Sequence, residues 1–284
     1  MGCKELNYEN KFKNYIELAK KIRANAIKAV YFGQSGHIGS ALSMADLIAY
    51  LYESVLVYKA DNPKWEGRDI FILSKGHAAA GMYGVLVEKS FFPREWIKGY
   101  YQDGGMLSGH VSHYVPGIEV STGSLGHGLP IGIGFALDFR KRKMKNRVFV
   151  MLSDGECNEG SNWEAFLFAP HNKLDNLTII IDYNKIQALG RCEDVLTLEP
   201  FAQKMKDFHW EVMEINGHDF REIEKAFSKI PLKKGKPSCI IAHTIKGKGV
   251  SFMEDKVSWH YNKVDDELLK KAFQELGVKD ENSF

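Results

Sequence analysis

The segment VFVMLSDGECNEG, residues 148–160, decides the fold. An unbroken apolar run leads into Ser-Asp-Gly, which is typical of a strand buried on both faces of a parallel sheet. The segment LTIIIDYNKI, residues 177–186, repeats this pattern. Ligands bind at the carboxyl edge of such a sheet, so Asp154 and Asn184 are candidate site residues.

Outward from these two segments, short apolar runs alternate with helical stretches. Further strands are expected at 69–73, 210–215 and 238–242, and helices near 78–88, 129–142, 161–171, 200–208 and 220–227. This alternation predicts an α/β fold with a mostly parallel sheet flanked by helices. No linker, repeat or low-complexity tract divides the chain, so one domain over residues 1–284 is favoured over two.

Helices are also expected near both ends of the chain. Apolar residues three and four apart predict a helix over residues 11–32, and Ser43 followed by Asp46 predicts the capped start of a second helix. Together they give a helical N-terminal segment at 11–56. The C-terminal tail, residues 263–284, is expected to be a short amphipathic helix with a polar end.

The composition narrows the class of protein. The 284 residues carry 38 Lys and Arg against 36 Asp and Glu, a net charge of +2, and 44% of them are hydrophobic. These values exclude a polyelectrolyte and predict a folded globular protein. The lysine-rich stretches 233–236 and 245–249 are therefore interpreted as solvated loops, and no nucleic-acid partner is expected.

Cysteine spacing and hydropathy bear on location. The four cysteines lack CxxC spacing, so neither a zinc site nor a disulfide framework is indicated. No apolar run approaches the roughly 20 residues that span a bilayer, and the N-terminal residues are polar, unlike a secretory signal. No membrane is expected as a partner, and a cytoplasmic location is expected.

A glycine-rich stretch, Thr122–Gly134, precedes the helix expected at 129–142. It lacks the GxGxxG pattern, because residue 131 is isoleucine, and the chain has no GxxxxGK(S/T). Backbone N–H groups just before a helix can still hold an anion. A tight turn with close helix packing explains the same glycines equally well.

Asp154 and Asn184 are the candidate metal ligands. A carboxylate, an amide oxygen and a free loop carbonyl are hard ligands that suit Mg²⁺ or Ca²⁺, with a diphosphate completing the shell. The two side chains leave adjacent predicted strands 30 residues apart, since 184 − 154 is 30. Taken singly, however, Asp154 could cap the following helix and Asn184 could form a turn.

Four of the ten histidines stand in small, polar, glycine-rich contexts, and these are His37, His77, His110 and His260. Imidazoles titrate near neutral pH and exchange protons with hydroxyl and carbonyl oxygens, so this set suits general acid–base chemistry on a sugar. The remaining histidines divide into His171, His209, His218 and His243, interpreted as structural, and His113 and His127, which stay undecided.

Together these motifs resemble the amino-terminal, diphosphate-binding part of the transketolase family, over roughly residues 12–265. The resemblance rests on SGHIGSALSMADL, SKGHAAAGMY, SGHVSHYVPGIEVSTGSLGHGL, SDGECNEGSNWEA, IIDYNKIQALG and HTIKGKGVSFMED, followed by Trp259 and His260. It implies the thiamine diphosphate-binding fold and a thiamine diphosphate enzyme.

Carried over position by position, the resemblance places a divalent metal, Mg²⁺ or alternatively Ca²⁺ or Mn²⁺, on Asp154, Asn184 and the carbonyl of Ile186. It assigns the four candidate histidines to catalysis around the thiazolium and the sugar. The implied cofactor contacts are His77, Gly123, Ser124, Leu125, Asp154, Gly155, Glu156, Glu159, Asn184, Ile186 and His260. Glu159 resembles the family's acid that links cofactor sites between chains.

The implied reaction is transfer of a two-carbon ketol unit from a ketose to an aldose, through a thiamine diphosphate carbanion. Whole transketolases continue with a pyrimidine-binding and a C-terminal domain, for which 284 residues leave no room. The resemblance therefore implies one subunit of a split transketolase, completed by a second chain that carries those domains. A two-plus-two heterotetramer acting on sugars or sugar phosphates is implied.

Two other interpretations stay open. The α subunit of a 2-oxo acid dehydrogenase, or of another thiamine-dependent synthase, shares the aspartate–glycine and asparagine elements, although the SKGH and SGHIG blocks argue against it. A catalytically silent, transketolase-like binding module would keep only the fold. The chain departs from the family pattern at Ile38, His127, Ser153 and Tyr261. All but Ser153 border the expected substrate cavity, so they bear on donor and acceptor identity.

Overall fold

The structure is a computed structural model that describes residues 3–278, with side chains from residue 8 onward. Its α-helices are α1 (Cys3–Gly33), α2 (Ile38–Ser43), α3 (Ala45–Tyr50), α4 (Ala79–Glu88), α5 (Gly128–Lys141), α6 (Gly160–His171), α7 (Cys192–Val195), α8 (Phe201–Asp207), α9 (Phe220–Phe227) and α10 (Asp266–Leu276). Leu51–Val55 is a π-helical turn, and short 3₁₀ helices lie at Gly76–Ala78, Arg94–Gly99, Gly155–Asn158 and Val257–His260. Among the described residues, no helix is long and apolar enough to cross a bilayer.

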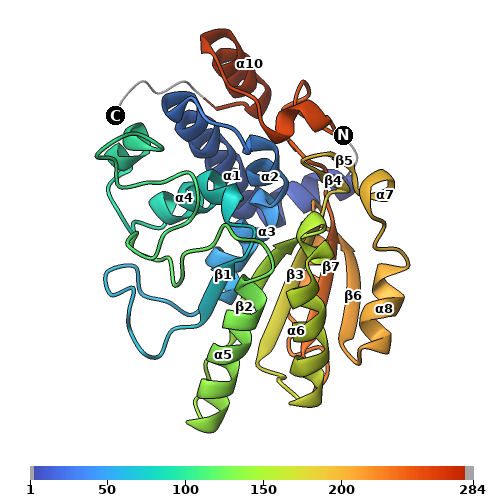
Figure 1. The fold of residues 1–284 in the computed structure, drawn as a ribbon. Helices are drawn as coiled ribbons and strands as arrows, with labels where there is room; N and C mark the ends of the chain where they lie inside the picture. The colour runs from blue at the N-terminus through green and yellow to red at the C-terminus, as the bar shows by residue number, and fades with distance from the viewer. Residues whose placement is uncertain (1–2, 279–284) are drawn as a thin grey trace.

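Five parallel strands form the central sheet, in the order β1-β2-β3-β7-β6 (Figure 1). They are β1 (Ile70–Leu73), β2 (Val148–Ser153), β3 (Leu177–Tyr183), β6 (Glu211–Asn216) and β7 (Ser238–His243). A separate antiparallel pair consists of β4 (Ile186–Gln187) and β5 (Gly190–Arg191). β2 and β3 are buried along their whole length, which explains their unbroken apolar sequences. The predicted α/β fold, a mostly parallel sheet flanked by helices, is confirmed.

Successive side chains of each strand enter two different cores, because they point to opposite faces of the sheet. On β1, Phe71 and Leu73 join the core shared with α1, α3, α4 and α9. Ile70 and Ile72 join the core under α5, α6 and α8. Figure 1 shows α5 and α6 in front of the sheet, with the N-terminal helices gathered above and behind it. This three-layer packing leaves the carboxyl ends of the strands free to carry a site.

The N-terminal helices differ from the sequence prediction at one junction. Ser43 does not cap a helix: it ends α2, and Met44 is the residue that precedes α3. The Ser43 hydroxyl donates instead to the Asp182 carboxylate at 2.5 Å, and Asp46 pairs with Arg23. The capping interpretation was wrong because both side chains are drawn to buried charged groups far away in the sequence.

At the other end, α10 lies within the predicted tail helix, and its N-cap Asp265 accepts a hydrogen bond from the Leu268 N–H at 2.8 Å. The rest of the tail prediction, residues 279–284, lies outside the described residues.

Candidate active site

The loops that follow β1, β2, β3 and β7 meet at one edge of the sheet. The register pairs Ser153 of β2 with Asp182 of β3, and Asp182 in turn with Ala242 of β7. Asp154 and Asn184 therefore leave neighbouring strands close together, as the sequence predicted.

A cleft of about 240 Å³ opens at this edge. Its lining residues are His37, Ser40, His77, His110, Gly123, Leu125, Ser153, Asp154, Gly155, Glu156, Ile186, Gln187, Ala188, Lys246 and His260. All four candidate histidines are among them, although they come from segments spread over most of the chain. Asn184 is buried beside the cleft, whereas Ser124 and Glu159 are exposed and do not line it.

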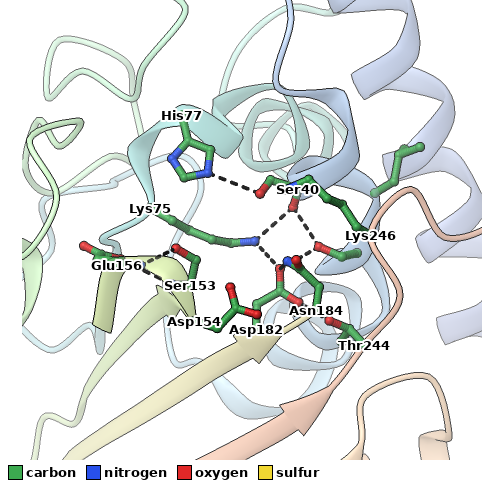
Figure 2. Close-up of polar contacts among 12 residues, drawn as sticks. Ser40, Lys75, His77, Ser153, Asp154, Glu156, Asp182, Asn184, Thr244 and Lys246 are labelled. Carbon is green, nitrogen blue, oxygen red and sulfur yellow. Dashed lines mark hydrogen bonds and ion pairs between the residues drawn. The ribbon is translucent and has the colours of Figure 1, made fainter. Parts of the chain in front are cut away.

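A buried ion pair underlies the cleft. Figure 2 shows the Lys75 ammonium between Ser40 and Asp182. It donates to the Asp182 carboxylate and, at 2.9 Å, to the Ser40 carbonyl, and both charged side chains are 0% exposed. Asp182 also accepts hydrogen bonds from Ser43, Thr244 and Asn184. Burial alone would raise the pKa of Asp182, but the Lys75 charge and these donors hold it below its ordinary value.

Asp154 is a buried carboxylate, 1% exposed, at the start of the Gly155–Asn158 turn. It accepts hydrogen bonds from the backbone N–H groups of Gly155, at 2.7 Å, and of Lys185. Burial, together with the neighbouring Asp182 charge, raises the pKa of Asp154 to about 6. A raised pKa means that neighbouring groups compensate the negative charge incompletely, so a cation would be stabilised here.

Asn184 and Ile186 add two neutral oxygens next to this carboxylate. The Asn184 side-chain oxygen accepts from the Ile186 N–H at 3.2 Å, and its amide nitrogen donates to Asp182 at 3.3 Å. The Ile186 carbonyl accepts from the Lys246 ammonium at 3.0 Å. One carboxylate, one amide oxygen and one carbonyl form a donor set that suits Mg²⁺.

Both of the simpler interpretations also hold locally, because Asp154 does cap a short helix and Asn184 does close a turn. Within residues 3–278, no group of three or more His, Cys, Asp and Glu side chains is arranged to hold a metal ion. A cation at this edge would therefore depend on amide and carbonyl oxygens as well as on Asp154.

The glycine-rich loop forms the wall next to the start of α5. Gly123 lines the cleft with a φ of +156°, and a Cβ there would lie 2.9 Å from the His110 ring. Glu156 also lines the cleft, but its carboxylate is already engaged. It accepts from the Ser74 hydroxyl at 2.5 Å and from the Gly126 N–H at 3.0 Å. Glu156 thus ties the loop after β1 to the glycine-rich loop.

The four histidines form one cluster centred on His37. Its ring centroid lies 5.3 Å from that of His77, 5.9 Å from that of His110 and 5.4 Å from that of His260. Burial, and then the His110 and Lys246 charges, lower the pKa of His37 to about 4. Burial, and then Lys246 and His37, lower the pKa of His260 to about 3. At neutral pH both imidazoles are uncharged, so they can accept and share protons.

Lys246 is the main residue of the cleft that the sequence interpretation misjudged. A solvated loop was expected, but this lysine is 1% exposed and donates to the His260 Nδ1 at 3.1 Å. Burial lowers the pKa of Lys246 to about 8. Ser40, whose hydroxyl lies 3.2 Å from the His77 Nε2, and Gln187 were also missed. Proximity to the candidate histidine in SGHIGS was the available signal for Ser40.

Tyr261 lies at the rim of the cluster. Its ring is edge-on to His37, with centroids 5.1 Å apart and planes at 82°. The same ring lies over Gly36, where a Cβ would come within 2.4 Å of it. The side chain is nevertheless 60% exposed. Tyr261, a departure from the family pattern, therefore packs against His37 but is not among the residues that line the cleft. The undecided His113 and His127 do not line the cleft and hydrogen-bond to Ser121 and to the Leu125 carbonyl.

Comparison with known protein families matches residues 15–284 to the family described as "Transketolase, thiamine diphosphate binding domain". The chain belongs to the transketolase family. It corresponds to the N-terminal domain of that family, as the sequence motifs had indicated.

Its relatives include proteins of similar length. The chain is 40% identical over 273 residues to an apulose-4-phosphate transketolase subunit of Actinobacillus succinogenes, covering 94% of this chain and 98% of that protein. It is 39% identical over 242 residues to a 6-deoxy-6-sulfo-D-fructose transketolase subunit of Clostridium sp., covering 85% and 88%.

Solved transketolases share the fold. The enzyme of Pichia stipitis, in complex with sedoheptulose-7-phosphate, matches with a TM-score of 0.89 and 28% identity, over 93% of this chain and 41% of that one. The Campylobacter jejuni transketolase matches with a TM-score of 0.85 and 30% identity, over 94% and 43%. The chain thus spans about two fifths of the length of these solved transketolases.

Proposed function

We propose that this chain is the N-terminal subunit of a split transketolase, which transfers a two-carbon ketol unit from a ketose to an aldose. The observation that carries the proposal is that four histidines, Asp154 and Ile186 line one cleft, with Asn184 buried directly beside it. The similarity to proteins that are named as transketolase subunits, and that this chain covers almost completely, supports it.

In this proposal Asp154, Asn184 and the Ile186 carbonyl hold a divalent metal, Mg²⁺ by preference. Gly123, Leu125 and Gly155 present backbone groups to the diphosphate that the metal neutralises. When bound, thiamine diphosphate supplies the electron sink that carbon–carbon bond cleavage needs. The raised pKa of Asp154 and the hard donor set support this assignment.

The histidines would act on the sugar. His37, His77, His110 and His260 border the cleft, and the lowered pKa values of His37, His77 and His260 keep these three rings neutral at pH 7. A neutral imidazole can accept a proton at one nitrogen and donate one from the other, which suits proton movements at hydroxyl and carbonyl oxygens. Ser40 can orient His77, because its hydroxyl lies 3.2 Å from the Nε2.

A second chain with the pyrimidine-binding and C-terminal domains would complete the enzyme, as two copies of each chain. The names of the similar proteins, which are subunits, support such a partner. Sugars or sugar phosphates are the proposed substrates. A cytoplasmic location agrees with Cys157, Cys192 and Cys239 being buried free thiols.

The experiment is a reconstitution assay. This chain is mixed with its complementing chain, Mg²⁺, thiamine diphosphate, a ketose donor and an aldose acceptor, and the transferred two-carbon unit is followed in the product. Ketol transfer is expected from the mixture and not from this chain alone.

Full turnover by this chain alone would refute the split-subunit proposal. Release of carbon dioxide from 2-oxo acids, without ketol transfer, would identify a 2-oxo acid enzyme instead. Cofactor binding by the complex without turnover of any ketose would favour the silent binding module.

A further inference from the structure

His218, in the loop after β6, joins two parts of the molecule that are far apart in the sequence. Its Nδ1 lies 2.7 Å from the Asp46 carboxylate of α3, and its Nε2 lies 2.9 Å from the backbone nitrogen of Ile245. A backbone N–H can only donate, so the Nε2 carries the lone pair. The Nδ1 therefore carries the proton and donates it to Asp46. The two neighbours together select one tautomer of His218.

The Asp46 end of this contact is rigid and charged. Arg23 of α1 donates to both carboxylate oxygens of Asp46, at 3.0 and 2.6 Å, and both side chains are buried. Burial alone would raise the pKa of Asp46, but Arg23 and His218 hold it at about 2. A bidentate arginine pair of this kind fixes the geometry as well as the charge. The carboxylate that orients His218 is thus anchored between two helices.

The Ile245 end leads directly to the cleft. The next residue, Lys246, donates to the Ile186 carbonyl at 3.0 Å and to the His260 Nδ1 at 3.1 Å. Lys246 is only 1% exposed, and burying an ammonium group costs free energy. The loop that carries Lys246 must therefore hold the side chain in place against its tendency to move toward water.

We infer that His218 is a positioning residue, which orients the Ile245 peptide through Asp46 and Arg23 and so holds Lys246 against Ile186 and His260. The neighbouring Thr244 and Gly247 add anchors, because they bond to the Asp182 carboxylate and to the Gly39 carbonyl. The expected effect on cofactor binding rests on the proposed function. The positioning of Lys246 by His218 does not.

Three variants separate this role from general stability. His218→Leu removes both hydrogen bonds, and His218→Gln keeps one donor and one acceptor on a planar group. His243→Leu is the matched control, since His243 lies two residues before Ile245 but is 42% exposed and pairs with Glu214.

The first measurement uses the unmodified chain. Long-range ¹H–¹⁵N NMR correlations of the imidazoles should show His218 protonated at Nδ1 and His260 unprotonated at Nδ1. A His218 protonated only at Nε2 would overturn the inference, and this result needs no variant to fold.

The second measurement compares the variants. His218→Leu should shift the His260 Nδ1 resonance. It should also weaken the affinity of the reconstituted complex for Mg²⁺–thiamine diphosphate about 10-fold or more, because Lys246 would no longer be held against the proposed metal ligand Ile186. With His218→Gln, the affinity should stay within about 3-fold of that of the unmodified complex. His243→Leu should change neither the His260 resonance nor the affinity. An unchanged His260 resonance in a folded His218→Leu chain would overturn the inference. If the unmodified complex fails to bind the cofactor, the proposed function fails. The His260 resonance still tests whether His218 positions Lys246.

Discussion

Replacing Lys75 with methionine removes one partner of the buried ion pair beneath the cleft. Lys75 and Asp182 are both 0% exposed, so the remaining carboxylate cannot regain its charge solvation from water. Removing one partner of a buried pair typically costs about 3–5 kcal/mol. Asp182 keeps donors from Ser43, Thr244 and Asn184, which places the expected cost near the lower end of that range.

A cost of about 3 kcal/mol lowers the melting temperature by roughly 6–12 °C, at about 2–4 °C per kcal/mol for a large domain. Chemical denaturation of Lys75→Met, Asp182→Asn and the double variant gives the coupling free energy. The double variant should lose less unfolding free energy than the two single variants lose together, by about 2 kcal/mol or more. The reason is that it leaves no unpaired buried charge.

The matched control is Lys20→Met, because Lys20 pairs with Glu17 on the surface of α1 at 37% and 52% side-chain exposure. A loss below about 0.5 kcal/mol is expected there. The stabilising role of the buried pair is disproved if Lys75→Met costs no more than this control, or if the two single losses simply add.

Three further predictions concern the cleft. Ser74→Ala leaves the buried Glu156 carboxylate with one donor fewer and should cost about 1.5–3 kcal/mol in urea unfolding, and a loss under 0.5 kcal/mol would contradict the role given to Glu156. Tyr261→Gly uncovers His37, so the His37 pKa should rise from about 4 toward 6.5 in an NMR titration, whereas Tyr261→Phe should leave it unchanged; equal values in both variants would exclude the ring as a cause. Between pH 6.5 and a lower limit of about 4 for His37 and about 3 for His260, these rings bind protons only in the unfolded state, so stability falls as pH falls through that range. Replacing both by glutamine should flatten that loss by up to about 1.4 kcal/mol per pH unit for each ring, less the screening of partly exposed rings, and an unchanged slope in denaturant midpoints would contradict the pKa shifts.

The sheet, and the edge at which Asp154 and Asn184 lie, could be predicted because their signals are local. An unbroken apolar run indicates a strand that is buried on both faces, and the polar residue after it indicates where the strand ends. Asp154 and Asn184 follow β2 and β3 in this way, and the observed register brings them together. Glycine contexts around the histidines likewise pointed to four residues that share one cleft.

The sequence predictions that were wrong concern residues whose partners are distant in the sequence. Ser43 resembled a helix cap, but it donates to Asp182, 139 residues away. Asp46 pairs with His218, 172 residues away. No local pattern encodes such contacts, because they form only when α2 lies beside the end of β3 and α3 lies beside the loop after β6.

The burial of the charged Lys246 could not be predicted for the same reason, because its partners are distant in the sequence. A lysine in the glycine- and lysine-rich stretch 245–249 is typical of a solvated loop. No local pattern indicates the Ile186 carbonyl and the His260 imidazole that accept its hydrogen bonds. Its burial follows from the path of the loop after β7, which the contacts of Thr244 and Gly247 determine.

The proposed cofactor site is tested most sharply by the affinity of the reconstituted complex for thiamine diphosphate, measured by calorimetry with and without Mg²⁺. We expect Mg²⁺ to strengthen binding and Asp154→Asn to abolish this effect, because in the proposed site this carboxylate would be the charged ligand of the metal. Glu193→Gln, an exposed acid of α7, is the control and should bind like the unmodified chain. Equal affinity with and without Mg²⁺, or an undiminished Mg²⁺ effect in Asp154→Asn, would rule out the proposed metal site.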